Sequence, residues 1–416
     1  MQRTIEPSEI RGAIAAPPSK SMMQRAVAAA MLADGDSCIF NPSWCDDSRA
    51  AMGIATALGA EIQTEENIVR IKGSKGIREN KLNCGESGLA VRMFSPIASL
   101  YPREITIDGT GSLKKRPMFI IGDALNQLGV RCLSSDGFLP LKINGPLKPG
   151  RCVIDGSISS QVLTGLLMAL PLTSGDSIIT VNNLKSKPYV DMTVRLLKDF
   201  GIDIVNEHYR KFIIRGNQKF IARNYEVEGD WSGGAFLLVA GAVKGSLRVQ
   251  GLRHNSLQSD RAIIEALKKA GANIVIEENA VEVSAADLKA FEFDATESPD
   301  LFPPLAVLAS YARGVSEIKG ASRLIHKESN RALALIEEFG KMNISIEMKG
   351  DALLITGGKI QGACVDSHND HRIAMAAAVA ALGAAGPVTV KDSDCVAKSY
   401  PEFFNDLVKA GAIIKE

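Results

Sequence analysis

The chain has 416 residues, which is enough for two or three domains with ample hydrophobic cores. Apolar residues make up 46% of the chain, charged residues 23%, and the net charge is +1, so no overall field points to nucleic acid or a membrane surface. The seven cysteines are scattered without a CxxC pair, which argues against a disulfide framework or a zinc ribbon.

The N-terminal residues 1–6 lack the apolar segment of a secretory signal. The longest apolar run, residues 373–388, is rich in Ala and Gly and shorter than a membrane span. We therefore expect a cytoplasmic monomer that acts on small molecules and has no nucleic-acid or membrane partner.

A helix-like stretch that ends on glycine before a strand returns six times along the chain. The six glycines are Gly59, Gly129, Gly201, Gly271, Gly340 and Gly411. Their spacings of 70, 72, 70, 69 and 71 residues predict one folding unit used six times. Glycine suits such a site because a helix often ends in a left-handed residue, which is unstrained without a Cβ atom.

A polar residue followed by an apolar run of small residues recurs in the same phase. The six starts are Ser21, Ser87, Ser160, Ser232, Asp300 and Asp370. Ser and Asp are favoured N-caps, and the runs are too uniformly apolar to be one-sided, so they predict six buried helices. If the units are arranged alike, the helix N-termini face a common region and attract anions. Six ordinary capped core helices are the alternative.

Strand-like runs alternate with two helices per unit, which predicts an α/β or α+β fold. Six units make two bodies of three, and the midpoint falls in the polar, Gly-containing stretch 226–231. We expect an N-terminal domain at 19–228 and a C-terminal domain made of 1–18 plus 229–416. The N-terminal segment would then supply strands to the C-terminal body.

The first polar cluster lies at the start of the first buried helix. Two prolines fix an extended entry, and Lys20, Ser21 and Arg25 can then reach one face of the helix. Such a face suits a phosphate or a carboxylate. A capped surface helix is the alternative, but Arg25 lies in an apolar run and would need a partner inside.

Further clusters in the first half place small residues, hydroxyls and cations at turns. They are Gly88 with Arg92, the basic loop 109–117 with Arg116, Ser159-Ser160-Gln161, and Ser186-Lys187-Pro188-Tyr189. Glycine permits close approach of a ligand, and hydroxyl and amide donors at a helix start suit an anion. A capped turn or a solvated loop without a ligand is the alternative for each.

The second half carries its own charged set. It contains Asp300 as a helix cap, His326 as a candidate base, Lys327, Glu328, Arg331, the run 369–372 with Arg372, and Lys398. A metal site at Asp366, His368, Asp370 and His371 is an open alternative, although cations crowd it and the spacing matches no standard motif. Many cations with few carboxylates predict a site for multiply anionic substrates with acid–base chemistry, without metal or cofactor.

At these residues the chain resembles the 5-enolpyruvylshikimate-3-phosphate synthase family of enolpyruvyl transferases, over its full length and in motif order. The resemblance implies the two-domain enolpyruvate transferase fold, with three βαβαββ units per domain and the active site in the interdomain cleft. The implied reaction transfers the enolpyruvyl group of phosphoenolpyruvate to the 5-hydroxyl of shikimate 3-phosphate and releases phosphate.

The resemblance also implies roles for individual residues. It assigns the binding of shikimate 3-phosphate to Lys20, Ser21, Arg25, Ser159, Ser160, Gln161, Ser186, Asp300 and Lys327. It assigns the binding of phosphoenolpyruvate to Lys20, Gly88, Arg116, Gln161, Arg331, Arg372 and Lys398. The catalytic candidates are Asp300, as base for the 5-hydroxyl, and Glu328 or Lys20, for the proton at the methylene carbon.

Three residues beside Gly88 depart from the common pattern of the family. Glu86 stands where many relatives carry Asn, Leu89 where they carry Thr, and Met93 where many carry Pro. These differences leave the reaction class intact and leave glyphosate sensitivity open. A carboxylate at position 86 would repel a phosphate unless it is protonated or paired, for which Arg92 is a candidate.

Two alternative functions are compatible with this fold. The sister enolpyruvyl transferase that acts on UDP-N-acetylglucosamine would need a reactive cysteine in the loop 109–117, which has none. A non-catalytic scaffold of the same fold would have no use for the charged set, because buried cations are costly.

Overall fold

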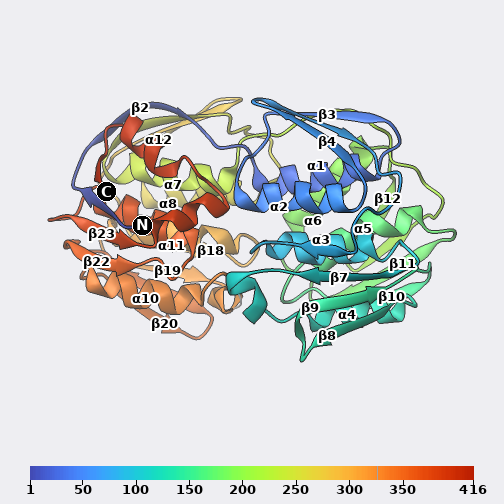
Figure 1. The fold of residues 1–416 in the computed structure, drawn as a ribbon. Helices are drawn as coiled ribbons and strands as arrows, with labels where there is room; N and C mark the ends of the chain where they lie inside the picture. Colours follow the sequence, from blue (N-terminus) through green and yellow to red (C-terminus); the bar gives the residue numbers. More distant parts are fainter. Residues whose placement is uncertain (326) are drawn as a thin grey trace. The chain divides into compact units, whose positions relative to one another are not determined.

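A computed structural model describes residues 1–325 and 327–416 (Figure 1). The chain divides into two compact units, here called the N-terminal unit (Pro18–Val227) and the C-terminal unit (Met1–Pro17 with Glu228–Glu416). These limits differ by one residue from the predicted domain limits. That each unit is an autonomous domain stays a prediction.

The N-terminal unit contains three repeats with the same succession of elements. The first comprises β14 (Asn224–Glu226), α1 (Lys20–Leu32), β3 (Asp36–Phe40), α2 (Asp46–Ala57), β4 (Glu61–Glu65) and β5 (Ile68–Lys72). The second comprises β6 (Lys81–Asn83), α3 (Gly88–Ala98), β7 (Glu104–Asp108), η1 (Gly111–Lys115), α4 (Phe119–Gln127), β8 (Arg131–Ser135) and β9 (Phe138–Asn144). The third comprises β10 (Arg151–Asp155), α5 (Gln161–Ala169), η2 (Leu170–Leu172), β11 (Ser177–Asn182), α6 (Lys187–Asp199), β12 (Ile204–Glu207) and β13 (Lys211–Ile214).

The C-terminal unit repeats this succession three times. The first comprises β2 (Ile10–Ala15), α7 (Trp231–Val243), β15 (Gly245–Gln250), η3 (Ser259–Ala262), α8 (Ile263–Ala270), β16 (Asn273–Ile276) and β17 (Ala280–Ser284). The second comprises β18 (Glu292–Asp294), η4 (Pro299–Leu301), α9 (Phe302–Ser310), β19 (Val315–Lys319), η5 (Ala321–Leu324), α10 (Arg331–Lys341), β20 (Ser345–Lys349) and β21 (Ala352–Thr356). The third comprises β22 (Ala363–Asp366), α11 (His371–Ala381), β23 (Val388–Lys391), η6 (Ser393–Lys398), α12 (Phe403–Lys409), β24 (Ile413–Lys415) and β1 (Arg3–Glu6).

The described residues form six sheets, each with four strands in the same order. The first strand of a repeat pairs in parallel with the second, and the fourth lies between the second and the third, antiparallel to both. A parallel pair needs a crossover connection, which the buried helix supplies in the four repeats whose first two strands are consecutive in the chain, and the last two strands form a hairpin in all repeats except the third of the C-terminal unit. The predicted six-fold repeat and mixed α/β class are therefore confirmed.

The N-terminal segment supplies strands to two sheets of the C-terminal unit, as predicted. Strand β2 pairs in parallel with β15, and β1 pairs with both β23 and β24. One strand thus opens the first repeat of this unit, while the other completes its third.

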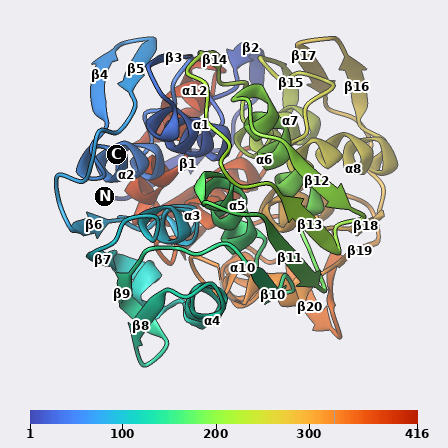
Figure 2. The ribbon, with the colours of Figure 1, turned by 90° about the vertical axis from the view of Figure 1, so that its right-hand side faces the viewer.

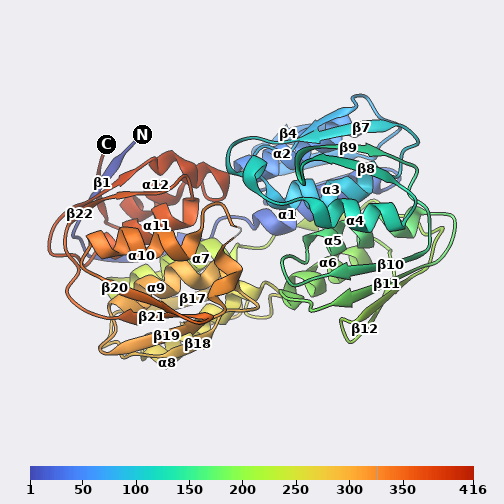
Figure 3. The same cartoon turned by 90° about the horizontal axis from the view of Figure 1, so that it is seen from below.

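The first helix of each repeat forms the core of its unit. Helices α1, α3 and α5 serve the N-terminal unit (Figure 2), and α7, α9 and α11 serve the C-terminal unit (Figure 3). Every residue of α11 is buried, because an Ala-rich helix that is apolar all round has no face suited to water. A Cβ atom on Gly165 of α5 would lie 2.6 Å from the Met93 carbonyl oxygen, so glycine lets α3 and α5 approach closely.

One of the six predicted helix ends is wrong. Five of the six repeat glycines adopt positive φ, but Gly340 lies within α10, and Asn343 takes the left-handed conformation after that helix. Asparagine tolerates this conformation, which allows the turn to lie at Asn343. The glycine period therefore predicted the turn three residues too early.

Three of the six predicted N-caps are also wrong, whereas Ser87 and Asp370 cap α3 and α11 as expected, and Ser160 is the N-cap residue of α5 without a side-chain hydrogen bond to that helix. The cap of α1 is Ser19 rather than Ser21, and the cap of α7 is Asp230 rather than Ser232. Asp300 lies inside the 3₁₀ turn η4, one turn before α9. A cap is decided by the backbone conformation of the flanking residue, which residue type alone does not fix.

No helix in the described part of the chain is both long and apolar enough to cross a bilayer.

Candidate functional site

Arg25 is a buried cation in the second turn of α1. Its Nε donates to Thr193 Oγ1 at 2.9 Å, its Nη1 donates to the Ser21 carbonyl oxygen at 2.8 Å, and its side chain is only 1% exposed. Burial lowers the pKa of Arg25 to about 10. Among the described residues no carboxylate forms an ion pair with Arg25, so the site holds a positive charge that an anion could neutralise.

Two further helices, α5 and α6, carry hydroxyl groups, and one of these contacts the cation directly. Thr193 of α6 lies 3.3 Å from Thr164 of α5, oxygen to oxygen, which links both helices to Arg25. Ser160 and Ser186 are buried at the starts of α5 and α6, and Ser186 has a left-handed φ of 57°. The Ser159 hydroxyl accepts a hydrogen bond from the Gln161 amide at 3.2 Å. Sequence reasoning missed Thr193, although it lies close to Ser186 in the chain.

Lys20 and Asp47 form a largely buried ion pair, with 2.9 Å between Lys20 Nζ and Asp47 Oδ2. Lys20 is the first residue of α1, and Asp47 lies in the first turn of α2. This ion pair therefore holds the starts of α1 and α2 together. Lys20 can act as a proton donor in it, and Asp47 can act as an acceptor.

Guanidinium groups converge on the backbone at Gly88. A Cβ atom there would lie 2.8 Å from Arg92 Nη1 and 2.9 Å from Arg116 Nη1. Arg92 Nη1 donates to the Gly88 carbonyl oxygen at 3.2 Å and to Gln161 Oε1 at 3.1 Å. Sequence reasoning gave Arg92 no binding role, but the structure places it with the predicted residues Gly88, Arg116 and Gln161.

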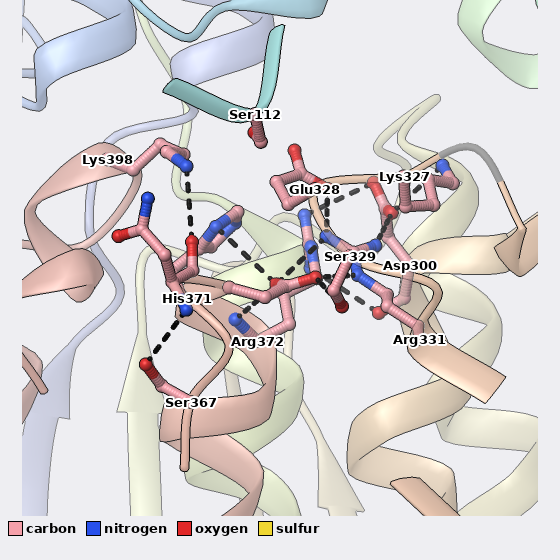
Figure 4. A network of polar contacts seen from close by, with 12 residues as sticks. Ser112, Asp300, Lys327, Glu328, Ser329, Arg331, Ser367, His371, Arg372 and Lys398 are labelled. Atoms are coloured by element: carbon pink, nitrogen blue, oxygen red, sulfur yellow. Dashed lines mark hydrogen bonds and ion pairs between the residues drawn. The ribbon is translucent and has the colours of Figure 1, made fainter. Parts of the chain in front are cut away.

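Arg331 is the centre of a charged network in the C-terminal unit (Figure 4). Its Nε donates to Asp370 Oδ2 at 2.8 Å, and its Nη1 donates to Asp300 Oδ1 at 2.7 Å. Its Nη2 donates to Glu328. Burial opposes the charge, but the three carboxylates outweigh burial and raise the pKa of Arg331. The sequence did not predict that Asp370 bonds Arg331 in this network.

Asp300 faces three cations. It accepts hydrogen bonds from Lys327 Nζ at 3.2 Å, from Arg331, and from Arg372 Nη2 at 3.2 Å. Burial favours the neutral acid, but Arg372, Lys327 and Arg331 together hold the pKa of Asp300 well below its usual range. Burial lowers the pKa of Lys327 despite the attraction of Asp300. Asp300 is therefore an anion at neutral pH.

The starts of the three core helices meet in this unit, as the sequence predicted for equivalent repeats. Arg372, at the start of α11, donates to the Ser232 hydroxyl on α7 and to the Asp300 carbonyl oxygen before α9. Lys398 Nζ donates to the Asn369 carbonyl oxygen at 3.4 Å, beside the same start. Four predicted cations, Lys327, Arg331, Arg372 and Lys398, thus lie around one cluster of helix ends.

The alternative metal site at Asp366, His368, Asp370 and His371 is not formed by the described residues. Asp370 binds Arg331, and His368 Nε2 lies 2.8 Å from Glu338 Oε1. Glu337, Glu338 and His368 do lie near one another, but Lys341 Nζ bonds both oxygens of Glu338 at 2.8 Å, so a cation already holds that carboxylate. His326, the candidate base, lies outside the described residues.

The family model for EPSP synthase (3-phosphoshikimate 1-carboxyvinyltransferase) matches residues 5–407. The chain belongs to the EPSP synthase family. It is 40% identical to a 3-phosphoshikimate 1-carboxyvinyltransferase of Clostridium novyi and 40% identical to one of Clostridioides difficile, in each case over 99% of this chain and 98% of the relative. The predicted family is therefore confirmed.

Solved structures agree with this assignment. EPSP synthase from Acinetobacter baumannii matches with a TM-score of 0.84 and 27% identity over 100% of both chains. The enolpyruvyl transferase NikO from Streptomyces tendae matches with a TM-score of 0.81 over 100% of this chain and 98% of that one, but its identity of 20% supports the fold alone. The predicted enolpyruvate transferase fold is confirmed.

Proposed function

We propose that this member of the EPSP synthase family transfers the enolpyruvyl group of phosphoenolpyruvate to the 5-hydroxyl of shikimate 3-phosphate. The single observation that carries the proposal is the full-length match to the family. Two features of the structure support it: a buried guanidinium that has no carboxylate partner among the described residues, and a separate cluster of cations around helix starts. Both suit substrates with several negative charges.

We assign the phosphate and ring of shikimate 3-phosphate to the surroundings of Arg25. The assigned set in the N-terminal unit is Lys20, Ser21, Arg25, Ser159, Ser160, Gln161 and Ser186. A phosphate at Arg25 would neutralise its charge and would accept hydrogen bonds from the serine hydroxyls of the assigned set. Asp300 and Lys327 of the C-terminal unit complete the proposed set.

We assign phosphoenolpyruvate to the guanidinium groups at Gly88 and to the cations of the C-terminal unit. The assigned set is Lys20, Gly88, Arg116, Gln161, Arg331, Arg372 and Lys398. Arginine forks match both carboxylate and phosphate oxygens. That residues of the two units share one cleft stays a prediction of the resemblance.

The proposed reaction has two steps. The oxygen of the 5-hydroxyl bonds to C2 of phosphoenolpyruvate while its proton passes to a base, and a proton adds to the methylene carbon. The resulting tetrahedral intermediate then loses a proton from that carbon as the C2–O bond to phosphate breaks. We assign the first proton to Asp300 and the proton at carbon to Glu328 or Lys20.

The charges around Asp300 set a condition on this role. As long as three cations face it, Asp300 is a weak base, because they stabilise its ionised form. Substrate anions that draw Lys327, Arg331 or Arg372 away would raise the pKa of Asp300 toward the range useful for a general base. The base would thus become effective as the substrates bind.

The test is to incubate the purified protein with shikimate 3-phosphate and phosphoenolpyruvate, and to measure phosphate release together with product mass. We expect one phosphate for each enolpyruvyl adduct. UDP-N-acetylglucosamine is tried in parallel as acceptor. Product from that acceptor alone, or from neither, would overturn the proposal.

A further inference from the structure

Glu86 lies on the turn between β6 and α3 and contacts the loop that carries Arg116. The Ser112 amide donates to Glu86 Oε2 at 3.1 Å, and the Ser112 hydroxyl donates to the same oxygen at 2.8 Å. The Thr110 amide donates to the Gly85 carbonyl oxygen at 2.7 Å. Three hydrogen bonds therefore fix the loop to the Glu86 turn.

The same Ser112 hydroxyl connects Glu86 to Arg116. Arg116 Nη2 donates to Ser112 Oγ at 3.2 Å. Because the hydroxyl proton is directed to the carboxylate, its lone pairs are free to accept from the guanidinium. An anionic acceptor also polarises the hydroxyl and makes it a better acceptor for Arg116.

The backbone of the loop is shaped around the carboxylate. Gly111 has a φ of +53°, and a Cβ atom there would lie only 2.4 Å from Glu86 Cδ. A side chain at position 111 would therefore push the carboxylate off Ser112. The Glu86–Ser112 contact therefore depends on glycine at position 111.

We propose that Glu86 is a positioning residue that holds the Arg116 guanidinium beside Gly88 through Ser112. The inference rests on the proposed function, which places phosphoenolpyruvate at Arg116. It also answers how a carboxylate is accommodated at this position: its charge is directed to the Ser112 amide and hydroxyl. Arg92, a candidate partner in the sequence, bonds Gly88 and Gln161.

The experiment compares the KM values for both substrates and kcat in Glu86→Ala, Ser112→Ala and the double variant. Each single variant should raise the KM for phosphoenolpyruvate by roughly 3- to 10-fold, the equivalent of one hydrogen bond, with a smaller change in the KM for shikimate 3-phosphate. The double variant should resemble either single variant, because both remove the same chain of contacts.

Conservative variants and a control complete the set. Glu86→Gln and Ser112→Thr keep an acceptor and a hydroxyl, so both should restore most of the affinity for phosphoenolpyruvate. Lys114→Gln is the matched control in the same loop, since its half-exposed amine pairs with Asp108. Its KM values should be unchanged. Amide hydrogen exchange should be faster at Ser112 in Glu86→Ala than in the wild type.

Three outcomes would overturn the inference. A lower KM for phosphoenolpyruvate in Glu86→Ala would mean that the carboxylate repels the substrate directly. Multiplicative effects in the double variant would mean that Glu86 and Ser112 act separately. Unchanged exchange at Ser112 would mean that Glu86 does not hold the loop. Wild-type turnover is measured first, because its absence would refute the proposed function. If the wild type turns over normally and the KM for phosphoenolpyruvate is unchanged in the variants, only the positioning role is refuted.

Discussion

Replacement of Arg25 by methionine tests whether this buried charge is kept for a ligand. Methionine matches the aliphatic part of the arginine side chain and removes the guanidinium charge. If Arg25 served the fold as half of a buried ion pair, its removal would destabilise the protein by about 3–5 kcal/mol. The contacts of Arg25 predict a different result.

The magnitude follows from the pKa of the guanidinium. Burial lowers this pKa from the ordinary 12.5 to about 10, and each pKa unit corresponds to about 1.4 kcal/mol. The charged form therefore costs the folded state about 3 kcal/mol at every pH below about 10, and the cost disappears only as the pH rises toward the unfolded-state value. The two hydrogen bonds of Arg25 offset about 1 kcal/mol each.

We therefore expect Arg25→Met to be as stable as the wild type or up to about 2 kcal/mol more stable. Thr193 is not left without a partner, because its hydroxyl also donates to the Tyr189 carbonyl oxygen at 2.8 Å. Arg195→Met, on the exposed face of α6, is the matched control and should change stability by less than about 0.5 kcal/mol.

The assay is urea unfolding at pH 7 with and without shikimate 3-phosphate. A ligand at 100 times its Kd stabilises the wild type by about 2.7 kcal/mol, and this increment should vanish in Arg25→Met. A loss of about 3 kcal/mol or more without ligand would refute the argument that Arg25 lacks an internal counter-charge. An undiminished ligand increment would refute its role at the phosphate.

Four further substitutions test the proposed site, three of them by phosphate release and Asp300→Asn by unfolding, with circular dichroism as the check on folding. Lys20→Met should abolish turnover in a folded protein, and a near-normal rate would remove Lys20 from the mechanism. Asp300→Ala should lower kcat by about 10²-fold or more, and a change confined to KM would make Asp300 a binding residue only. In Asp300→Asn the free energy of unfolding should fall less steeply than in the wild type as the pH is lowered below about 4. The reason is that a carboxylate with a depressed pKa stabilises the fold above its unfolded-state pKa and loses this effect as the pH falls through its folded-state pKa. Gly88→Ala should raise the KM for phosphoenolpyruvate, because its methyl group would displace Arg92 and Arg116; an unchanged KM would contradict this crowding.

The sequence predicted those features that arise from local chemistry repeated along the chain. The glycine period gave six repeats, and the uniformly apolar runs gave six buried helices, because a helix without a polar face must lie in a core. Ser87 and Asp370 were correctly predicted as caps. The charged clusters pointed to anionic substrates because cations beside helix starts favour anions wherever the helices lie.

The helix ends that were predicted wrongly show the limit of reasoning from local sequence. Gly340 continues α10, and Asn343 takes the left-handed turn instead. Ser19 caps α1 in place of Ser21, because the residue with extended backbone provides the cap. Which residue caps or ends a helix depends on the path of the chain between the helix and the neighbouring strand, and tertiary packing sets that path.

Only the tertiary structure decided which charge meets which. Arg25 and Arg331 are both buried arginines, yet Arg331 binds three carboxylates while Arg25 meets hydroxyl and carbonyl oxygens. Likewise, Glu86 bonds Ser112, a residue of a different connecting loop, and this contact was not predicted from the sequence. The energy of a charge depends on the partners brought to it within a few ångströms, and residues distant in the chain supply those partners only once the fold is made.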